Sequence, residues 1–298
     1  MTTTTAEKSG RRPVRAGLLL VLAGLGAVIA LRGRLPDPGE TLAVLGAVDG
    51  WWAAAAVVAA LGSQLAFADQ QRRLLAGFGV RVPAGRVIAM TLGRSAMSMT
   101  LPAGSAVSAA FAFRIYRRYG AATSVAVTVT AVSGLLSMVA LALLYLAGWL
   151  VSTPAAVPWA ILGAAAVLPL LFWGRGLLAK VPRQVWTGGL GAAVVNWALD
   201  MFCLVAAAAA CQVTLGWWEL ALIYLAVQVV RQVPLTPGGV GLIEASMLAG
   251  LIAAGMPEVT AAAVVLLYRL VSFWMILPMG LAGWLAIRDR KPEVRTEA

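Results

Sequence analysis

Histidine is absent from this sequence, and only 12% of its 298 residues are charged. The lack of histidine removes the commonest general acid or base and the commonest metal ligand among side chains. A soluble domain of this length carries roughly 25% charged residues, so the chain has too little polar surface to face water on all sides. These deficits argue against a soluble enzyme, and we expect no metal and no cofactor.

Cysteine is also scarce. The two present, Cys203 and Cys211, fall on one predicted helix. The helical rise of 1.5 Å per residue separates them by about 12 Å, which is too far for a disulfide. We therefore interpret both as small apolar side chains.

Apolar runs are what the sequence has in abundance, since 61% of the residues are hydrophobic. Runs long enough to cross the roughly 30 Å hydrocarbon core predict an all-α integral membrane protein. The first run follows basic residues as in a signal peptide, but no clear cleavage site follows it, so we interpret it as a transmembrane helix. The runs cover residues 16–31, 51–68, 87–113, 121–150, 157–174, 188–211, 219–254 and 258–287.

The net charge of +11 is concentrated in short segments outside these runs. In a soluble protein it would suggest a nucleic-acid partner, which we do not expect here. Loops rich in Lys and Arg stay in the cytoplasm, so the basic segments predict a multi-pass protein of the cell (cytoplasmic) membrane with both termini cytoplasmic. The expected organisation is a cytoplasmic tail at 1–15, a single transmembrane domain at 16–287 and a cytoplasmic tail at 288–298.

Two of the runs are interrupted near their middles. Residues 87–113 contain TLPAGS at 100–105 and lie between basic loops, whereas residues 219–254 contain PLTPGGVG at 234–241 and lie between loops without basic residues. The limbs on either side have roughly 10–15 residues and are too short to span a bilayer. We therefore expect two re-entrant hairpins that enter from opposite faces, together with six full spans.

The two halves of the chain resemble each other at a fixed offset of 135 positions. Pro102 then aligns with Pro237, and Gly104 with Gly239, while LAGW at 146–149 aligns with LAGW at 281–284. Residues 101–149 give 12 identities in 49 pairs, and the proline, glycine and tryptophan matches in register indicate a real repeat. Three full crossings per unit predict an inverted repeat, with repeat 1 at about 51–185 and repeat 2 at about 186–287. Inverted repeats with broken helices are a recurrent transporter plan.

The broken segment and a few intramembrane charges are the candidate site. Gly238, Gly239 and Gly241 allow a tight reversal, and the N–H groups of the limb that starts near Val240 suit an anion; a ligand-free hairpin is the alternative. Charges inside apolar runs usually face a partner or a wet cavity. Glu244 and Arg269 are a possible structural pair, which would leave Arg231 for a phosphate. The weaker candidate is Arg94, since it could extend to the interface.

Uncharged polar residues and one carboxylate add to this set. Asn196 and Asp200 share a helix face, and we favour hydrogen bonding between helices over a transport role for them. Further candidates for a polar lining are Gln64, Asp69, Gln228, Gln232 and Tyr268.

The second half also carries a motif, P-x-T-P-G-G-x-G-x-x-E followed by a glycine and L-Y-R. It is matched at Pro234, Thr236, Pro237, Gly238, Gly239, Gly241, Glu244, Gly255, Tyr268 and Arg269, and LPAG at 101–104 is similar to an earlier motif. By these residues the chain resembles the transmembrane, flippase-like region of lysylphosphatidylglycerol synthases and the stand-alone UPF0104 group. The resemblance implies movement of an aminoacylated phospholipid across the membrane. The soluble synthase domain does not follow in this sequence, so we do not carry over synthase activity.

From these observations we expect a flippase-like translocator of a phospholipid or a lipid-linked anionic head group, and not an enzyme. The expected partners are membrane lipids, chiefly anionic, with a possible partner enzyme in trans. The expected substrate-binding residues are Arg94, Arg231, Thr236, Pro237, Gly238, Gly239, Gly241, Glu244, Tyr268 and Arg269. The alternatives are a structural or partner subunit of a membrane lipid- or glycan-modifying enzyme, a membrane transferase acting on a lipid carrier, and a small-solute exporter.

Overall fold

A computed structural model gives the fold. It describes residues 37–101, 103–151, 172, 174–176, 178–179, 181–231 and 239–288, the backbone alone at 149–151. The helices of the described residues are α2 (Pro38–Gly46), α3 (Gly50–Gly77), α4 (Ala84–Thr100), α5 (Gly104–Arg118), α6 (Thr123–Val151), α8 (Arg183–Ala210), α9 (Trp217–Arg231), α10 (Leu242–Ala253), α11 (Glu258–Arg269), the π-helical segment η3 (Leu270–Trp274) and α12 (Ile276–Arg288).

Four helical segments are long and apolar enough to cross a membrane. They are α3, α6, α8 and the continuous stretch Glu258–Arg288 formed by α11, η3 and α12. The shortest apolar stretch, Thr123–Gly148 of α6, has 26 residues, which at 1.5 Å per residue is about 39 Å and exceeds the hydrocarbon core. The predicted helical membrane protein is confirmed to this extent. The runs at 16–31 and 157–174 lie wholly or largely outside the described residues, so the predicted six spans stay a prediction.

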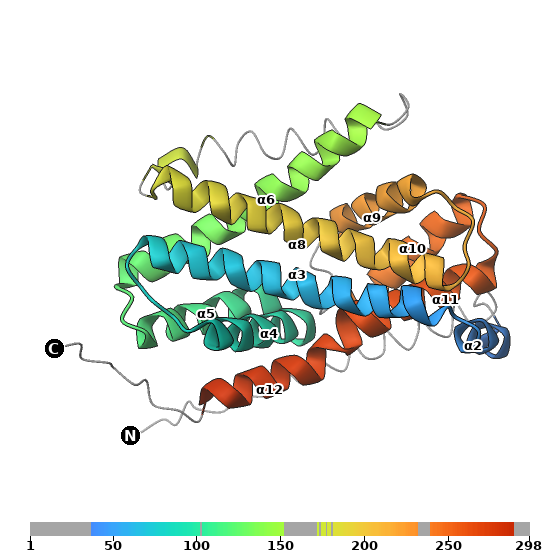
Figure 1. The fold of residues 1–298 in the computed structure, drawn as a ribbon, viewed down its shortest axis with the longest axis horizontal. Coiled ribbons are helices and arrows are strands. Elements are labelled where there is room, and N and C mark those ends of the chain that lie inside the picture. Colours follow the sequence, from blue (N-terminus) through green and yellow to red (C-terminus); the bar gives the residue numbers. More distant parts are fainter. Residues whose placement is uncertain are drawn as a thin grey trace, which may run out of the picture.

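Antiparallel helices α3 and α8 lie side by side at the centre of the molecule (Figure 1). Helix α6 crosses α8, and α12 packs along α4. The pair α4–α5 occupies one half of the long axis and the pair α9–α10 the other, with the helix ends at the two breaks directed toward the middle (Figure 1). This arrangement brings four helix ends together at mid-length.

Both predicted interruptions separate two short helices that contact each other. Helix α4 ends at Thr100 and α5 begins at Gly104, whose hydrogen points at backbone: an added Cβ would lie 2.4 Å from the carbonyl oxygen of Ser98. Helices α9 and α10 flank the second interruption, of which residues 232–238 lie outside the described part. The placement of these pairs as re-entrant hairpins stays a prediction.

Proline and glycine set many of the helix ends. Pro83, Pro182 and Pro257 each precede a first helical turn, where a missing N–H costs nothing. Gly120 and Gly255 follow the ends of α5 and α10 with φ of 84° and 92°, the left-handed conformation that favours glycine. These two glycines align at the offset of 135, so equivalent helix ends are made in the same way.

The basic segments on either side of residues 87–113, which we expected to be loops, are partly helical. Helix α5 continues to Arg118, so Arg114 and Arg117 lie on a helix, and α3 continues past Arg72 and Arg73. The polar segment after residue 32 contains α2, which begins at a proline and is capped by Asp37. The prediction of loops failed here because charged residues can extend a helix beyond its apolar part as long as they reach water.

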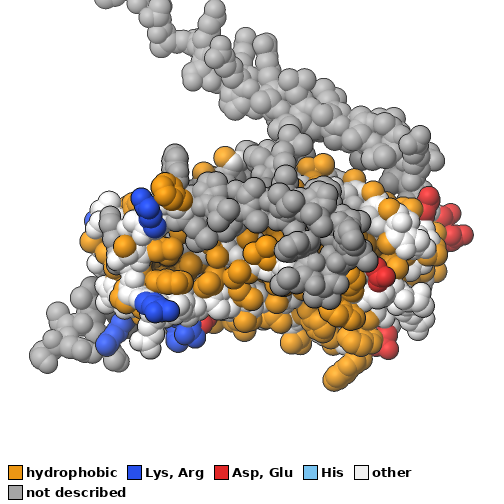
Figure 2. Space-filling model, turned by 90° about the horizontal axis from the view of Figure 1, so that it is seen from above, with side chains coloured by type: hydrophobic (Ala, Val, Ile, Leu, Met, Phe, Trp, Pro, Cys, Tyr) orange, Lys and Arg blue, Asp and Glu red, His pale blue; other side chains and the backbone are white. Residues whose placement is uncertain are grey.

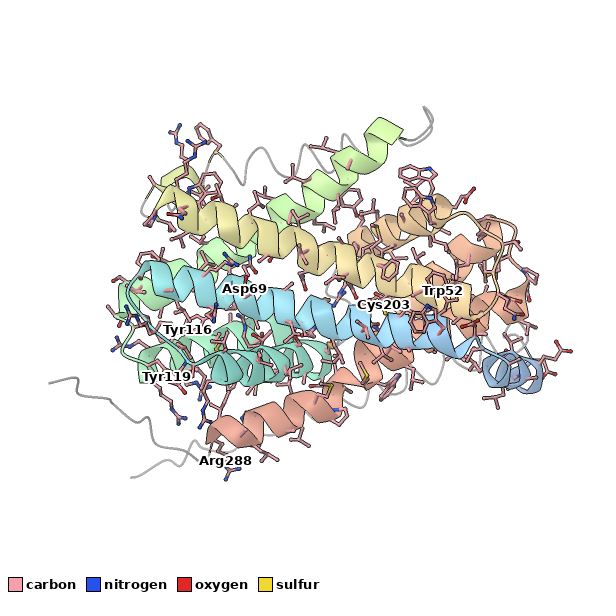
Figure 3. All side chains as sticks on the ribbon, viewed as in Figure 1. Trp52, Asp69, Tyr116, Tyr119, Cys203 and Arg288 are labelled. Atoms are coloured by element: carbon pink, nitrogen blue, oxygen red, sulfur yellow. The ribbon has the colours of Figure 1, made fainter. Side chains whose placement is uncertain are left out.

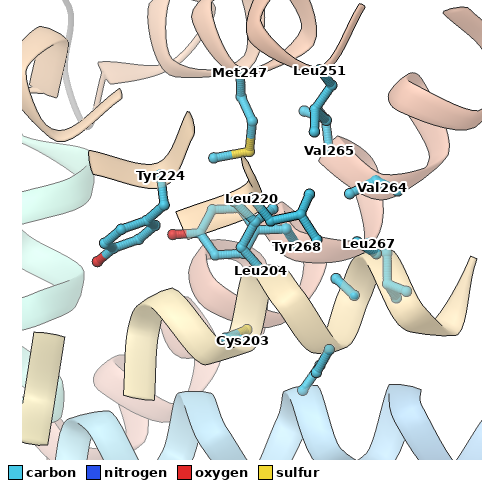
Figure 4. Packing of buried hydrophobic residues seen from close by; sticks show 14 of the residues in the cluster. Cys203, Leu204, Leu220, Tyr224, Met247, Leu251, Val264, Val265, Leu267 and Tyr268 are labelled. Atoms are coloured by element: carbon cyan, nitrogen blue, oxygen red, sulfur yellow. The ribbon is translucent and has the colours of Figure 1, made fainter. Parts of the chain in front are cut away.

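Buried apolar side chains form two clusters, one in each half of the molecule. The first joins α3, α8, α9, α10 and α11, and Figure 4 shows its middle around Leu204, Met247 and Leu251. The second joins α3, α4, α5 and α6 around Leu74, Met90 and Tyr116. The two free cysteines are both buried within the first cluster, and Figure 4 shows Cys203.

Charges of opposite sign lie at opposite ends of the long axis. Figure 2 shows Lys and Arg gathered at one end, Asp and Glu toward the other, and hydrophobic side chains between them. Arg288, at the end of α12, marks the basic end, whereas Trp52, at the start of α3, lies toward the acidic end (Figure 3). A belt of apolar surface between two charged ends is the pattern expected of a bilayer protein.

Candidate functional site

A polar cavity of about 290 Å³ lies where the ends of the two helix pairs approach each other. Its lining comes from α3, α4, α5, α6, α8, α9, α10, α11 and η3, so both pairs contribute to one space. The sequence did not reveal whether the two predicted hairpins meet, and the structure brings their ends to the same cavity. The charged residues of the lining are Arg94, Asp200, Arg231 and Arg269.

Asp200 of α8 is held by two tyrosines. The hydroxyl of Tyr224 donates to its Oδ2 at 2.7 Å, and the hydroxyl of Tyr268 lies 3.4 Å from its Oδ1. Both rings are buried in the cluster of Figure 4. Ser63 Oγ donates to the Oδ1 of the neighbouring Asn196 at 2.9 Å. The expected hydrogen bonding between helices is therefore formed, and both α8 side chains also face the cavity.

Arg231 ends α9 beside this carboxylate. Its Nη1 lies 3.9 Å from Asp200 Oδ2, and 37% of its side chain is exposed. At that distance the pair is an ion pair without a close hydrogen bond. The guanidinium therefore retains donors for another anion, as the sequence analysis expected of it.

Glu244 and Arg269 form the predicted ion pair. Arg269 Nε donates to Glu244 Oε1 at 2.6 Å, and its guanidinium carbon lies 4.3 Å from the centre of the Phe273 ring. Arg269 is 7% exposed, and its Nη2 is buried without a hydrogen-bond partner among the described atoms. This arginine is therefore largely committed to the fold, although it lines the cavity.

Glu244 also caps the helix that it begins. Its Oε2 accepts a hydrogen bond of 2.7 Å from the N–H of Gly241, directly before α10. The sequence predicted that this helix start faces a bound anion, but the chain's own carboxylate takes that position. Gly239 and Gly241 have φ of 67° and 84°, consistent with the expected reversal. Thr236, Pro237, Gly238 and Gln232 lie outside the described residues.

Arg94 of α4 lies inside the protein and lines the cavity, with 8% of the residue exposed. The alternative in which its side chain extends to the membrane interface is therefore wrong. The guanidinium carbon lies 5.2 Å from the centre of the Phe67 ring of α3. Packing against α3 and α5 directs the side chain inward, and the apolar pattern of α4 alone did not determine that direction.

Seven serines in the lining were not among the predicted residues. They come from four helices and the π-helical segment, and they are Ser63, Ser95, Ser98, Ser105, Ser108, Ser137 and Ser272. The sequence contained a signal for some of them. Arg94 and Ser98 are four positions apart, and Ser105 and Ser108 are three apart, so each pair lies on one face of its helix. Ser137 and Ser272 align at the offset of 135, so both repeats place a hydroxyl here.

Of the other predicted polar residues, Gln64, Gln228 and Tyr268 line the cavity, whereas Asp69 does not. Asp69 pairs instead with Arg73 at 2.5 Å within the exposed end of α3. Ser272 lies in the π-helical segment that follows Arg269 directly, where the N–H of Met275 donates to the carbonyl of Leu270. Such segments are frequent at functional sites, and no sequence pattern predicted this one.

Comparison with known proteins supports the resemblance carried by the motif. Residues 175–280 match the family described as the lysylphosphatidylglycerol synthase TM region. No curated protein matches the sequence. The matched range contains Asp200, Arg231, Glu244 and Arg269, whereas Arg94 lies outside it. Over residues 175–280 the chain is therefore similar to the lysylphosphatidylglycerol synthase TM region, which agrees with a membrane protein.

Proposed function

We propose that this protein is a flippase-like translocator that moves a phospholipid, or a lipid-linked anionic head group, across the cytoplasmic membrane. The observation that carries the proposal is the polar cavity at mid-length of an otherwise apolar helical protein. Three arginines and one aspartate line it. Ionisable groups at membrane depth are costly and usually serve a substrate path, and a lipid-related family agrees with a lipid cargo.

The size of the cavity fits a head group. Small-molecule sites have volumes of roughly 300–1,000 Å³, and this cavity, of about 290 Å³, is at the lower limit. Acyl chains need no such enclosure because they can remain in the surrounding lipid. In the proposal, Arg231 attracts the phosphate, and Glu244 balances the charge of Arg269, which lies at the edge of the same space.

Helix bounds support the inverted repeat that such a mechanism needs. Shifted by 135 positions, α3 covers 185–212, close to α8, and α4 covers 219–235, close to α9. The same shift places α5 at 239–253, over α10, and α6 at 258–286, over α11 to α12. Helices α3 and α8 run antiparallel (Figure 1), which agrees with inversion. Rocking of the two units about the cavity would expose it alternately on each side.

The charge distribution supports an orientation. The basic end, which includes Arg288 at the close of α12, would face the cytoplasm by the positive-inside rule. The C-terminal tail would then be cytoplasmic, and the proposal retains a cytoplasmic N-terminus, six spans and two re-entrant pairs. We also propose that the protein catalyses no reaction itself, that its partners are membrane lipids, and that an enzyme can act with it in trans.

The test is lipid translocation in proteoliposomes. Wild-type protein is reconstituted with a fluorescent phosphatidylglycerol or, separately, a fluorescent phosphatidylcholine, and exposure of the label to a membrane-impermeant quencher is followed. We expect faster movement of the anionic lipid than in empty liposomes and little movement of the zwitterionic one. Arg231→Met should slow the anionic lipid, whereas Arg118→Met, at an exposed position of α5, should not. Equal rates with and without protein would contradict the proposal.

A further inference from the structure

Arg94 differs from the other charged residues of the cavity because no carboxylate among the described residues forms an ion pair with it. The ion pairs among the described residues join Arg72 and Arg73 to Asp69, Arg231 to Asp200, and Arg269 to Glu244. Arg94 belongs to none of these ion pairs, although it is buried, with only 8% of the residue exposed. A buried charge without a counter-charge is costly. Either the free-energy cost of burying Arg94 is left uncompensated, or a bound ligand supplies the negative charge.

Neutral groups hold the guanidinium in place. Its Nη1 donates to the hydroxyl of Tyr116 at 3.4 Å, and its Nε to Ser108 Oγ at 3.5 Å. Both distances are at the long limit for hydrogen bonds. An arginine has five N–H donors, so these contacts orient the group and leave most of its hydrogen-bonding capacity unused.

Tyr116 is in turn fixed by a chain of hydrogen bonds. Its hydroxyl donates to Gln71 Oε1 at 2.5 Å, and Gln71 Nε2 donates to Ser133 Oγ at 2.5 Å. Tyr116, Gln71 and Ser133 are each at most 2% exposed and come from α5, α3 and α6. Figure 3 shows Tyr116 on the side of α3 where α4 and α5 lie. No member is charged. The chain therefore positions Arg94 without neutralising it, as a preformed anion site requires.

Hydroxyl groups complete the surroundings. Ser98 of α4, and Ser105 and Ser108 of α5, line the cavity with Arg94. A guanidinium beside hydroxyl donors suits the geometry and charge of a phosphate oxygen pair. The carboxylate of the cavity lining, Asp200 on α8, is engaged by two tyrosines and by Arg231.

We propose that Arg94 is the main anchor for a phosphate group in this cavity, with Tyr116 as its positioning residue. Arg231, beside Asp200, attracts the phosphate without being its main anchor, and Arg269 serves the fold. The site would take a phosphate either as the phosphodiester of a lipid or as a free anion. Its assignment to a lipid rests on the proposed function, whereas the anion site itself stands on the geometry of α4 and α5.

The test is equilibrium binding to the full-length protein in detergent, with three probes. They are dihexanoyl phosphatidylglycerol, inorganic phosphate and the uncharged dihexanoylglycerol, and the readouts are the Kd and the shift in Tm. We expect the phosphatidylglycerol to bind and Arg94→Met to weaken it about tenfold or more, because hydrogen bonds to charged groups are the strong ones. Arg94→Lys should weaken it less, and Arg118→Met not at all.

Tyr116→Phe should weaken binding several-fold in the wild type and have no further effect in Arg94→Met, because it acts through the arginine. The Tm without ligand separates this role from a structural one. Removing an uncompensated buried charge should leave the Tm of Arg94→Met equal to or above that of wild type. A lower Tm with unchanged Kd would show that Arg94 serves the fold and would overturn the proposal.

The three probes keep this inference distinct from the proposed function. Binding of phosphatidylglycerol together with inorganic phosphate supports the anion site, and binding of phosphatidylglycerol alone supports a lipid source. Equal binding of the uncharged dihexanoylglycerol would overturn the anion site. If Arg94→Met loses binding while wild type moves no lipid in liposomes, the anion site stands and the translocator fails. If wild type moves lipid and Arg94→Met binds and moves it equally well, the translocator stands and the role of Arg94 fails.

Discussion

Arg269 and Glu244, 25 residues apart in the chain, meet at 2.6 Å and join the end of α11 to the start of α10. The same carboxylate accepts the Gly241 N–H at 2.7 Å. One side chain thus fixes a helix start and balances a buried arginine. This double use makes the pair a structural element at the edge of the cavity.

Glu244→Gln should destabilise the protein, because Arg269 would be left buried and uncompensated. Removing one partner of a buried ion pair costs about 3–5 kcal/mol, and since the side chain of Glu244 is 28% exposed, we expect a loss of about 2–3 kcal/mol. Denaturation in detergent measures it. The double variant Glu244→Gln with Arg269→Met should regain most of the loss, and equal instability of single and double variants would contradict the account.

The two tyrosines that hold Asp200 should differ in their contributions. Tyr224 donates at 2.7 Å, whereas Tyr268 lies at 3.4 Å. A hydrogen bond to a charged group contributes about 1.5–3 kcal/mol, so Tyr224→Phe should lower the free energy of unfolding by roughly that amount and Tyr268→Phe by less. Unfolding curves of the two single variants provide the comparison. A larger loss of unfolding free energy in Tyr268→Phe than in Tyr224→Phe would contradict this expectation and show that the longer contact contributes more.

Glycines let α12 approach α4 closely. A Cβ at Gly283 would lie 2.5 Å from the carbonyl oxygen of Ala89, and one at Gly280 would lie 2.6 Å from that of Leu92. Gly283→Ala should therefore force the helices apart and cost about 1–3 kcal/mol. The matched control is Gly148→Ala, the equivalent glycine of the other LAGW string. Its Cβ would meet only the side-chain end of Leu225, at 3.3 Å, so we expect little change in Tm there and a clear fall for Gly283→Ala.

Ala103 carries backbone strain at the first interruption. Its φ of 53° lies in the left-handed region, which costs a residue with a Cβ roughly 1–2 kcal/mol. Gly238 stands at the equivalent position of the second half. Ala103→Gly should raise the free energy of unfolding by about 0.5–1 kcal/mol after the entropy of glycine is deducted. A lower Tm for this variant would show that the backbone is not strained there.

The helices themselves were predictable, because long apolar runs, prolines and glycines determine where a membrane helix begins and ends. The intramembrane pair Glu244–Arg269 was also predictable, since a buried charge requires a partner. The direction of Arg94 was not, because the contacts with α3 and α5 that turn it inward are tertiary. The serines of the lining were missed for a similar reason: small polar residues at Ser95 or Ser137 resemble ordinary helix positions until neighbouring helices enclose them.

Alternate exposure of the cavity is the central claim, and two-sided labelling tests it most directly. In a Cys203→Ala, Cys211→Ala background, a single cysteine replaces Ser137 or Ser272, which line the cavity from equivalent positions. A membrane-impermeant maleimide is applied to intact cells and, separately, to inside-out vesicles. The control is a cysteine at Ser133, which is 2% exposed and should stay unlabelled. The account predicts that both cavity positions react from both sides. Labelling of both positions from one side only would contradict alternating access.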